Sequence, residues 1–503
     1  MSIATYDVLI VGSGIMGACA ARVIRDARPD ARILMIDAGP VLGEVPGQHL
    51  HDMPDGQLRM QYNKRVSSGI QGLYVGAEVT EDLGAAITDV EPGMYRLSTF
   101  GEESAAMPAA ALAWNAGGMG IHWTAATPTP WGAEVPPFID QDEWARDLAT
   151  TSSVLRVNAD PFGGSHLRET LTTALNEVFG ARSAPGREVQ PLPMAINEDD
   201  QGGMIRTGPN RIFPPIANVS DDGFDLRTGC QALALVTADG LVRGATIRDV
   251  ASGSEHMLMA AQVIVCADAF RTPQLLFASG IRPAALGRYL NEHMFLSGRA
   301  RVDPAAVELD PARLGKEPGG EWRHINFWLP HSDEAQPFNG QFSGTVRVSG
   351  DGQPVEASAG ISLYVPTEVR AENRVEFDER HLDSAEMPRM RIVFDYSEKD
   401  RRLLDEARRV QATAGRRLGA FDAETDAQLL PPGASLHMTG TVRMGPTDDD
   451  TSVCDPTGRV WGYDNLYVAG CGVVPTALVG NSTLSGAVTA VRAARAVAEG
   501  LGQ

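Results

Sequence analysis

The fold is decided by the stretch from Tyr6 to Gly39, which reads YDVLIVGSGIMGACAARVIRDARPDARILMIDAG. Its first apolar run, residues 6–12, and a second one within residues 31–39 have the length and composition of buried strands. Between them, residues 16–27 have the pattern of a helix. Because continuous apolar strands are typical of a sheet that is covered on both faces, this strand–helix–strand unit predicts a parallel sheet in an α/β fold.

A glycine turn joins the first strand to the helix. Gly12, Gly14 and Gly17 have the spacing GxGxxG, and Asp37 ends the next strand about twenty residues later. The first glycine permits a tight turn, the second lets the backbone approach a pyrophosphate, and the third lets helix and strand pack closely. The helix N-terminus can hold the phosphates, and Asp37 can accept hydrogen bonds from a ribose diol. The spacing predicts a dinucleotide site without distinguishing NAD from FAD.

Size and charge narrow the class of protein. The 503 residues suffice for two domains, and a net charge of −21 argues against a nucleic-acid or anionic-membrane partner. The N-terminus lacks the features of a signal peptide, and no apolar stretch has the length of a membrane span. We therefore expect a cytoplasmic protein. The five cysteines are scattered and lack CxxC spacing, so neither a disulfide framework nor a metal site is indicated.

The changes in composition along the chain predict one domain that is assembled from discontinuous pieces, with a second domain between them. The βαβ-like and apolar blocks assign the first domain to residues 1–47, 113–151, 226–294 and 430–503. Segments richer in proline, glycine and acidic residues assign the second domain to residues 48–112, 152–225 and 295–429. Within the second domain, residues 60–74 are a candidate arm or lid, and an exposed connector is an equally good interpretation.

Three later stretches show which dinucleotide is expected. They are VIVCADAFRTPQLLFASGI (263–281), SLHMTGTVRMG (435–445) and NLYVAGCGVVPTALVGNSTLSGAVTAVRAA (465–494). With the N-terminal glycine turn, they resemble the glucose-methanol-choline (GMC) family of FAD-dependent oxidoreductases, over a little under half of the chain. The resemblance implies FAD, a Rossmann-type FAD-binding domain, and an interleaved α+β substrate-binding domain that is built on an antiparallel sheet.

The resemblance also assigns catalytic roles. Members of the family carry a histidine in an HxxGT motif, here His437, and a histidine or asparagine before the last helix, here Asn481. A neutral histidine can take a hydroxyl proton near pH 7, and Asn481 can orient the same hydroxyl. Taken alone, the two residues are equally compatible with a structural histidine and a helix N-cap. Most members have an aspartate and a serine where this chain has Gly470 and Gly472.

Three features together resemble pyranose oxidases, and in particular bacterial relatives that include C-glycoside 3-oxidases. They are the glycines at 470 and 472, Asn481, and the stretch AGGMGIHWTAATP (116–128). In that subfamily the histidine of HWT can bond covalently to the flavin 8α-methyl group, and the threonine lies near flavin N5. Here these residues are His122 and Thr124, so Thr124 joins the catalytic candidates. Because Ile121 stands where the fungal motif has threonine, covalent attachment stays open.

The residues that the resemblance assigns to the cofactor come from the glycine turn, the HWT loop, the middle block and the start of the last helix. They are Gly12, Gly14, Ile15, Met16, Gly17, Asp37, Ala38, Gly117, Gly118, Gly120, His122, Trp123, Thr124, Ala232, Gly472, Asn481, Ser482 and Thr483. The helix that starts near Ser482 can direct its free N–H groups at the N1–C2=O edge of the flavin, where they would stabilise negative charge.

The resemblance implies oxidation of a secondary hydroxyl, at C3 or C2, of a sugar or glycoside to a keto sugar. C-glycosides are candidate substrates, FAD accepts the hydride at N5, and O2 or a quinone reoxidises it. An aliphatic alcohol or choline oxidoreductase, a hydroxynitrile lyase and a non-catalytic flavoprotein are the alternatives. A quaternary ammonium substrate would favour an aromatic cage, whereas only 6% of the residues are aromatic. The oligomeric state stays open.

The stretch FWLPHSDEAQPFNGQF (327–342) is a candidate sugar-binding loop. It combines aromatic side chains with the amides of Gln336, Asn339 and Gln341, and sugars are held by amides and stacked rings. A surface loop of this composition is common, so an ordinary connector is the alternative. Together with His437 and Asn481, these three residues are the predicted substrate-binding set.

Overall fold

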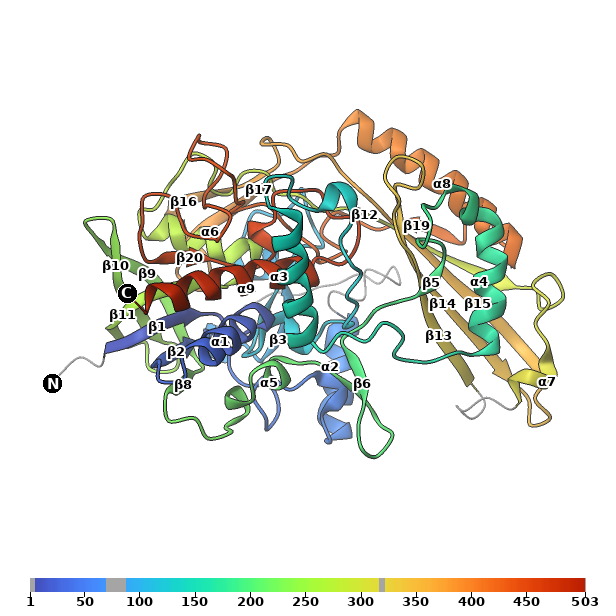
Figure 1. Ribbon diagram of the computed structural model, residues 1–503, viewed down its shortest axis with the longest axis horizontal. Helices are drawn as coiled ribbons and strands as arrows, with labels where there is room; N and C mark the ends of the chain where they lie inside the picture. The colour runs from blue at the N-terminus through green and yellow to red at the C-terminus, as the bar shows by residue number, and fades with distance from the viewer. Residues whose placement is uncertain (1–4, 69–86, 316–321, 503) are drawn as a thin grey trace.

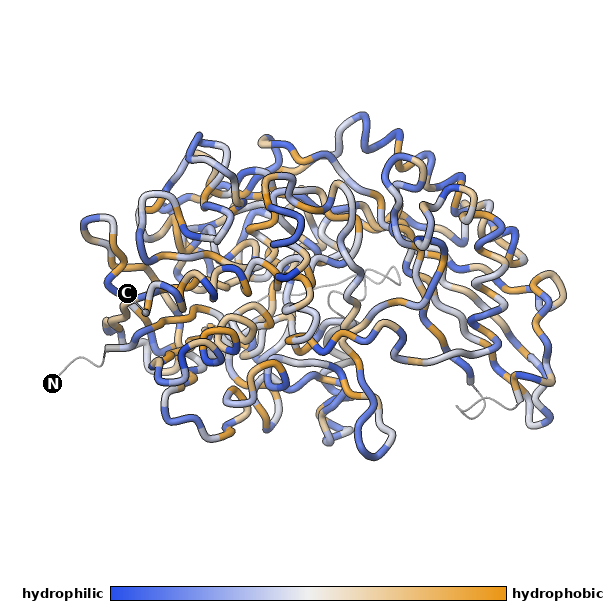
Figure 2. The backbone as a smooth tube through the Cα atoms, in the orientation of Figure 1, coloured by the Kyte–Doolittle hydropathy of each residue, from blue (hydrophilic) through white to orange (hydrophobic). Residues whose placement is uncertain are grey.

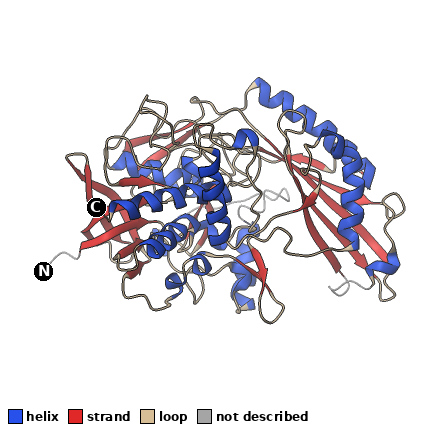
Figure 3. Ribbon diagram, viewed as in Figure 1, coloured by secondary structure: helices blue, strands red, loops and turns tan. Residues whose placement is uncertain are grey.

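The computed structural model describes residues 5–68, 87–315 and 322–502 of the chain. The molecule has two lobes, each built on one large sheet, with both termini in the same lobe (Figures 1 and 3). The first lobe holds the N-terminal βαβ unit and the C-terminal helix. The second holds a large antiparallel sheet with helices on one face.

The sheet of the first lobe has the strand order β8-β2-β1-β11-β10-β9, and β20 pairs with the free part of β11. The strands β8, β2, β1, β11 and β20 are parallel to their neighbours along this path, whereas β10 pairs antiparallel with β11 and β9. The strand bounds are β1 (Thr5–Val11), β2 (Ile33–Ile36), β8 (Phe224–Arg227), β9 (Cys230–Ala238), β10 (Leu241–Asp249), β11 (Glu255–Val265) and β20 (Leu466–Val468).

Helices cover this sheet, as its apolar strands require. Val8, Leu9 and Ile10 of β1 are fully buried, and so are all four residues of β2. The helices of this lobe are α1 (Ile15–Ala27), α3 (Gln141–Val154), α5 (Pro209–Ile212), α6 (Asp268–Ala278) and α9 (Thr483–Gly500). Figure 2 shows hydrophobic residues along α9 and the strands near it, and hydrophilic residues in the outer loops.

The alanine-rich helix α9 packs against α1 and α3. Small side chains on α1 and α9 let the two helices approach closely. A buried ion pair adds to this packing, because Asp147 of α3 accepts hydrogen bonds from Arg492 and Arg495 of α9. Opposite charges must be paired where they are buried, so this pair fixes α9 relative to α3.

The sheet of the second lobe has the order β18-β12-β15-β14-β13-β5, with β19 also pairing with β12, and its pairings are antiparallel. The strands are β5 (Gln190–Pro191), β12 (Met294–Val302), β13 (Trp322–Leu329), β14 (Asn339–Val348), β15 (Pro354–Val365), β18 (Gly419–Ala420) and β19 (Ala427–Leu429). Helices α4 (His166–Phe179) and α8 (Glu398–Leu418) pack on one face, and α7 (Pro311–Leu314) contacts α4 (Figure 1).

Smaller elements complete the chain. They are α2 (Gly56–Ser68) and the hairpins β3 (Gly93–Arg96) with β4 (Ala111–Trp114), β6 (Ile196–Glu198) with β7 (Met204–Arg206), and β16 (Arg374–Leu382) with β17 (Pro388–Val393). The β16–β17 hairpin packs on α6, although it belongs to a range that the sequence assigns to the second domain. Of the candidate arm, residues 60–68 belong to α2, and residues 69–74 lie outside the described residues.

The architecture confirms the predicted fold class, a parallel-stranded α/β lobe interleaved with an antiparallel α+β lobe. The helix predicted before the C-terminus begins at Thr483, and Ser482 rather than Asn481 stands at its N-cap position. Among the helices of the described chain, none is both long and apolar enough to cross a membrane.

Candidate active site

A cavity of about 270 Å³ lies where the parallel strands β1, β2 and β11 end. Ligands of open α/β sheets bind at this edge. Twelve of the residues predicted to hold a cofactor line the cavity: Gly12, Gly14, Ile15, Met16, Asp37, Ala38, Gly118, Gly120, Trp123, Ala232, Ser482 and Thr483. The others, namely Gly17, Gly117, His122, Thr124, Gly472 and Asn481, are not among its lining residues.

The glycine turn brings backbone to the cavity wall. Gly12 has φ +105°, a conformation that L side chains rarely adopt, and a Cβ there would lie 2.5 Å from the Cys266 carbonyl oxygen. A Cβ on Gly17 would lie 2.0 Å from the Gly12 carbonyl oxygen, so glycine is needed where α1 packs on the turn. Gly14 has no atom closer than 3.7 Å at that position and lines the cavity, which leaves room for a ligand beside its backbone.

The N-termini of two helices line this cavity. Gly14 precedes α1 and Ser482 precedes α9, neither side chain caps its helix, and neither first turn contains an acidic residue. The orphan N–H groups and the helix dipoles therefore favour negative charge at both ends. One end suits a pyrophosphate and the other suits an anionic ring edge. These two donor sets, together with the glycine turn, fit the FAD that the resemblance implies.

Asp37 lies at the end of β2, and its side chain binds the glycine turn. Its carboxylate accepts hydrogen bonds from the backbone N–H and the hydroxyl of Ser13 (3.0 and 2.7 Å) and from the N–H of Gly39 (2.9 Å). Burial raises the pKa of this carboxyl above its usual range, although these hydrogen bonds act against it. Ser13 also accepts from the Gly117 N–H (2.8 Å), which ties the glycine turn to the loop that precedes His122.

His122 lies outside the wall of the large cavity. Its Nε2 is 2.7 Å from the side-chain oxygen of Asn115, its Nδ1 is hydrogen-bonded to the Tyr62 hydroxyl, and the rings of Tyr62 and His122 are stacked. Thr124 is exposed. The structure therefore places Trp123 at the cavity and holds its two neighbours elsewhere.

His437 and Asn481 meet in the interior, and His293 joins them. His437 Nδ1 is 2.9 Å from His293 Nε2, and His437 Nε2 is 3.1 Å from Asn481 Nδ2. The Asn481 side-chain oxygen accepts a hydrogen bond from Gln341 Nε2, and Gln341 Oε1 accepts one from the Tyr364 hydroxyl (3.2 Å). Leu436 and Met438 line the large cavity, so His437 lies between two wall residues.

The direction of this hydrogen-bond chain follows from its first member. His293 Nδ1 is 3.1 Å from the Leu478 carbonyl oxygen, which can only accept, so Nδ1 carries the proton. In a neutral ring, His293 Nε2 then accepts, and His437 Nδ1 must donate to it. His437 Nε2 consequently presents its lone pair to the N–H of Asn481. The network thus assigns His437 the tautomer of a base that acts through Nε2.

Burial keeps both histidines neutral. It lowers the pKa of His293 to about 4 and lowers the pKa of His437 well below its usual range, with the neighbouring His293 as a second cause for His437. A neutral imidazole is the form that can accept a proton. The pair is therefore ready to act as a base at physiological pH.

The residues beside His293 brace the loop that carries His437. Glu292 accepts hydrogen bonds from the N–H groups of Gly433 (2.6 Å) and Ser435 (3.1 Å) and from the Ser435 hydroxyl. Burial raises the pKa of Glu292 to about 7. Asn291 exchanges two backbone hydrogen bonds with Thr439 on the other side of His437. No motif in the sequence marks these residues as functional, and their one signal is a polar tripeptide, NEH (291–293), before the apolar start of β12.

The three predicted sugar-binding amides separate in the structure. Gln341 contacts Asn481, and Asn339 lines a second, smaller cavity to which Asn481 also contributes. Gln336 is fully buried in its own turn, where its Nε2 donates to the Phe338 carbonyl (3.1 Å). Only Gln341 and Asn339 therefore lie beside Asn481.

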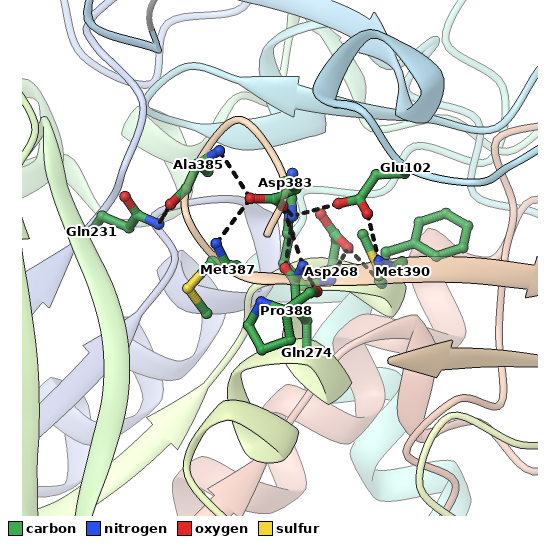
Figure 4. Close-up of polar contacts among 11 residues, drawn as sticks. Glu102, Gln231, Asp268, Gln274, Asp383, Ala385, Met387, Pro388 and Met390 are labelled. Atoms are coloured by element: carbon green, nitrogen blue, oxygen red, sulfur yellow. Dashed lines mark hydrogen bonds and ion pairs between the residues drawn. The ribbon is translucent and has the colours of Figure 1, made fainter. Parts of the chain in front are cut away.

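A charged cluster shapes another part of the large cavity (Figure 4). Arg271 of α6 pairs with Glu102 (3.0 Å) and with Asp383 of the β16–β17 turn. Asp383 in turn accepts from the N–H groups of Ala385 and Met387, two residues that line the cavity. The cluster thus holds the β16–β17 turn against the cavity.

One proton is shared within this cluster. Burial raises the pKa of Glu102 to about 8, because it outweighs the nearby Arg271. Burial is also the largest influence on Asp383 and acts to raise its pKa, but the Arg271 charge and the hydrogen bonds from Glu102, Met387 and Arg271 together outweigh it, so the pKa is lowered. At neutral pH Glu102 is therefore protonated, and the cluster of one arginine and two carboxyl groups is neutral.

The chain is similar to known proteins over most of its length. The sequence model of the GMC oxidoreductase family matches residues 210–295 and 369–490. A C-glycoside 3-oxidase from Arthrobacter globiformis is 36% identical over 99% of this chain and 96% of its own length. A pyranose 2-oxidase from Tricholoma matsutake is 26% identical over 99% of this chain and 94% of its own. A pyridoxine 4-oxidase structure from Mesorbium loti shares the fold, with TM-score 0.59 and 18% identity over 97% of this chain and 98% of that one.

The protonated state of Glu102 predicts a pH dependence of stability. Its pKa is about 8 in the fold, above the usual value, so the folded chain holds a proton that the unfolded chain has already lost. The free energy of unfolding must then fall as the pH rises toward 8. Glu102→Gln removes this pH-dependent contribution, and its amide can still donate to Asp383. Between about pH 6 and about pH 9, the free energy of unfolding should therefore fall by roughly 2 kcal/mol more for wild type than for the variant.

Urea unfolding of both proteins across this pH range measures the difference. Glu103→Gln is the matched control, because its carboxyl group is half-exposed in a surface ion pair with Arg389. Parallel stability curves for wild type and Glu102→Gln would rule out a buried proton at this position.

Proposed function

The chain belongs to the GMC oxidoreductase family, and from this premise we propose that it is an FAD-dependent oxidase of a secondary sugar hydroxyl. The substrate is a sugar or glycoside, with C-glycosides included, and C3 or C2 becomes a ketone. The observation that carries the proposal is the contact between a neutral, half-buried His437 and the buried side chain of Asn481 beside the large cavity. The similarity of the chain to a C-glycoside 3-oxidase and a pyranose 2-oxidase supports a sugar, rather than choline or a simple alcohol, as the substrate.

Each side chain at the site has a separate role in the proposed reaction. His437 Nε2 takes the hydroxyl proton, because the network leaves its lone pair available. The Asn481 N–H, which now points at that lone pair, turns to the substrate oxygen and holds the hydroxyl in place. The N-terminus of α9 stabilises negative charge that develops in the cavity. When FAD is bound, it supplies the hydride acceptor, and O2 or a quinone then takes the electrons.

We further propose that FAD is held without a covalent bond. Covalent attachment requires a nitrogen of His122 to approach the flavin methyl group, and both ring nitrogens already have side-chain partners in Tyr62 and Asn115. His122 is also absent from the wall of the large cavity, while the neighbouring Trp123 is part of it.

Acid precipitation tests the mode of attachment. The yellow colour should remain in the supernatant, because only non-covalent contacts hold the cofactor. A yellow pellet that becomes colourless in His122→Ala would instead establish a bond through His122.

Anaerobic reduction of the holoenzyme tests the activity itself. We expect bleaching of the flavin by at least one member of a panel of free sugars, O-glycosides and C-glycosides, with NMR identifying the keto carbon. His437→Ala should slow reduction by about 10²–10⁴-fold, which is the usual contribution of a general base. If no sugar bleaches the flavin, the sugar assignment is wrong, and an unbleached flavin with cyanohydrin cleavage would indicate a lyase.

The tautomer assignment predicts an effect of His293→Leu. Without its acceptor, His437 Nδ1–H is no longer fixed and the second cause of the lowered pKa is removed. We expect kcat to fall by about 10-fold or more. The acid limb of the kcat profile should move to higher pH, because a base with a higher pKa is protonated earlier on acidification.

His324→Leu is the control, because it makes the same substitution at an exposed histidine of β13 that lies away from the site. A pH profile that is unchanged in His293→Leu would reduce His293 to a packing role.

A further inference from the structure

The second cavity, of about 10 Å³, lies against Asn481. Its polar wall includes Glu134, Arg187 and Asn339, and the Trp328 ring forms another part of it. A space of this size holds one water molecule or the oxygen of one hydroxyl group. The cavity therefore suits a single polar atom of a larger ligand.

Asn339 contributes a buried donor that has no partner. Its Oδ1 accepts the Nε1–H of Trp328, and because an indole can only donate, the two ends of the amide are assigned unambiguously. Within the described parts of the chain, the Nδ2 group has no hydrogen-bond partner, in a residue that is 2% exposed. Buried donors without partners are rare and costly, so this one indicates a ligand atom that completes it.

Arg187 contributes a second donor of the same kind. Its Nε donates to the His331 carbonyl (2.7 Å), and its guanidinium lies over the rings of Trp131 (4.7 Å) and Trp328 (5.7 Å). Its Nη2 is buried and has no hydrogen-bond partner among the residues that the structure describes. The stacked, hydrogen-bonded guanidinium is fixed in place, so little freedom is lost when it binds a further acceptor.

Glu134 balances the charge and connects the cavity to Asn481. Its carboxylate accepts hydrogen bonds from the N–H groups of Trp131 (3.0 Å), Val479 (2.7 Å) and Gly480 (3.3 Å). Val479 and Gly480 directly precede Asn481, so the wall of the cavity also sets the position of that side chain. With one carboxylate and one guanidinium in the wall, the site favours a neutral acceptor over an anion.

We propose that this cavity is a hydroxyl-binding subsite that receives one ring hydroxyl of the substrate, next to the hydroxyl that His437 deprotonates. The hydroxyl oxygen accepts hydrogen bonds from Arg187 Nη2 and Asn339 Nδ2. This subsite rests on the proposed sugar oxidation and explains how the enzyme selects which carbon reacts. A ring that lacks this hydroxyl leaves two buried donors unpaired, which is the strongest form of discrimination between similar ligands.

A double-mutant cycle on the holoenzyme tests the subsite. The substrate is a glycoside that wild type oxidises, together with its 2-deoxy, 4-deoxy and 6-deoxy forms. Arg187→Met keeps the length of the side chain and removes the donors, and Asn339→Asp keeps the acceptor for Trp328 and removes Nδ2. Arg182→Met is the matched control, because that arginine pairs with Glu406 at the surface.

We expect wild type to lose about 10- to 100-fold in kcat/KM on one deoxy form, as for a lost hydrogen bond to a charged group. Each variant should lose a similar factor on the parent glycoside and little more on that same deoxy form, because the two changes remove one interaction. Arg182→Met should behave as wild type does.

Two results would overturn the subsite. If the losses from the variants and from deoxygenation multiply for every analogue, the cavity holds water only, and the sugar oxidation stands. If wild type turns over no sugar at all, the proposed function fails and the subsite fails with it. Because Asn339→Asp alters a different element from Arg187→Met, misfolding of one variant leaves the other to decide.

Discussion

The Leu478 carbonyl accepts one hydrogen bond from His293, and the direction of the catalytic network depends on it. A carbonyl cannot donate, so the proton on His293 Nδ1 is fixed, and the tautomer of His437 follows from it. The same short segment continues through Asn481 into the N-terminus of α9. One stretch of chain therefore sets the base, supplies its amide neighbour and presents the helix end that favours negative charge.

The site lies where the two lobes meet. The parallel sheet supplies the glycine turn and Asp37, which line the large cavity, whereas strand β14 of the antiparallel sheet supplies Asn339 and Gln341. His293 stands immediately before β12, so the antiparallel sheet also holds the base in register with the cavity. A division of this kind lets one lobe keep the cofactor chemistry constant while residues of the other select the substrate.

The sequence predicted the fold class well because its signals are local. The βαβ unit at residues 6–39 and the last helix depend on periodicity and glycine spacing, and both are found in the structure. The resemblance also selected His437 and Asn481, and the composition of residues 327–342 selected Gln341; the structure brings these three residues into contact.

Other parts of the site arise only from tertiary contacts. His293 lies 144 residues from His437, and Glu134 lies 345 residues from Val479, so no local pattern joins them. Arg187 comes from a segment without a recognisable motif. Conversely, the resemblance of the HWT motif predicts that His122 and Thr124 lie at the cofactor. In the structure, His122 is held by hydrogen bonds to Tyr62 and Asn115, and Thr124 is exposed.

The central claim, that His437 is neutral and carries its proton on Nδ1, is tested most directly by ¹⁵N NMR of histidine-labelled holoenzyme, with His437→Gln identifying the signals. Near pH 7 we expect a protonated Nδ1 and an unprotonated Nε2 for His437. A proton on Nε2, or a doubly protonated ring, would contradict it.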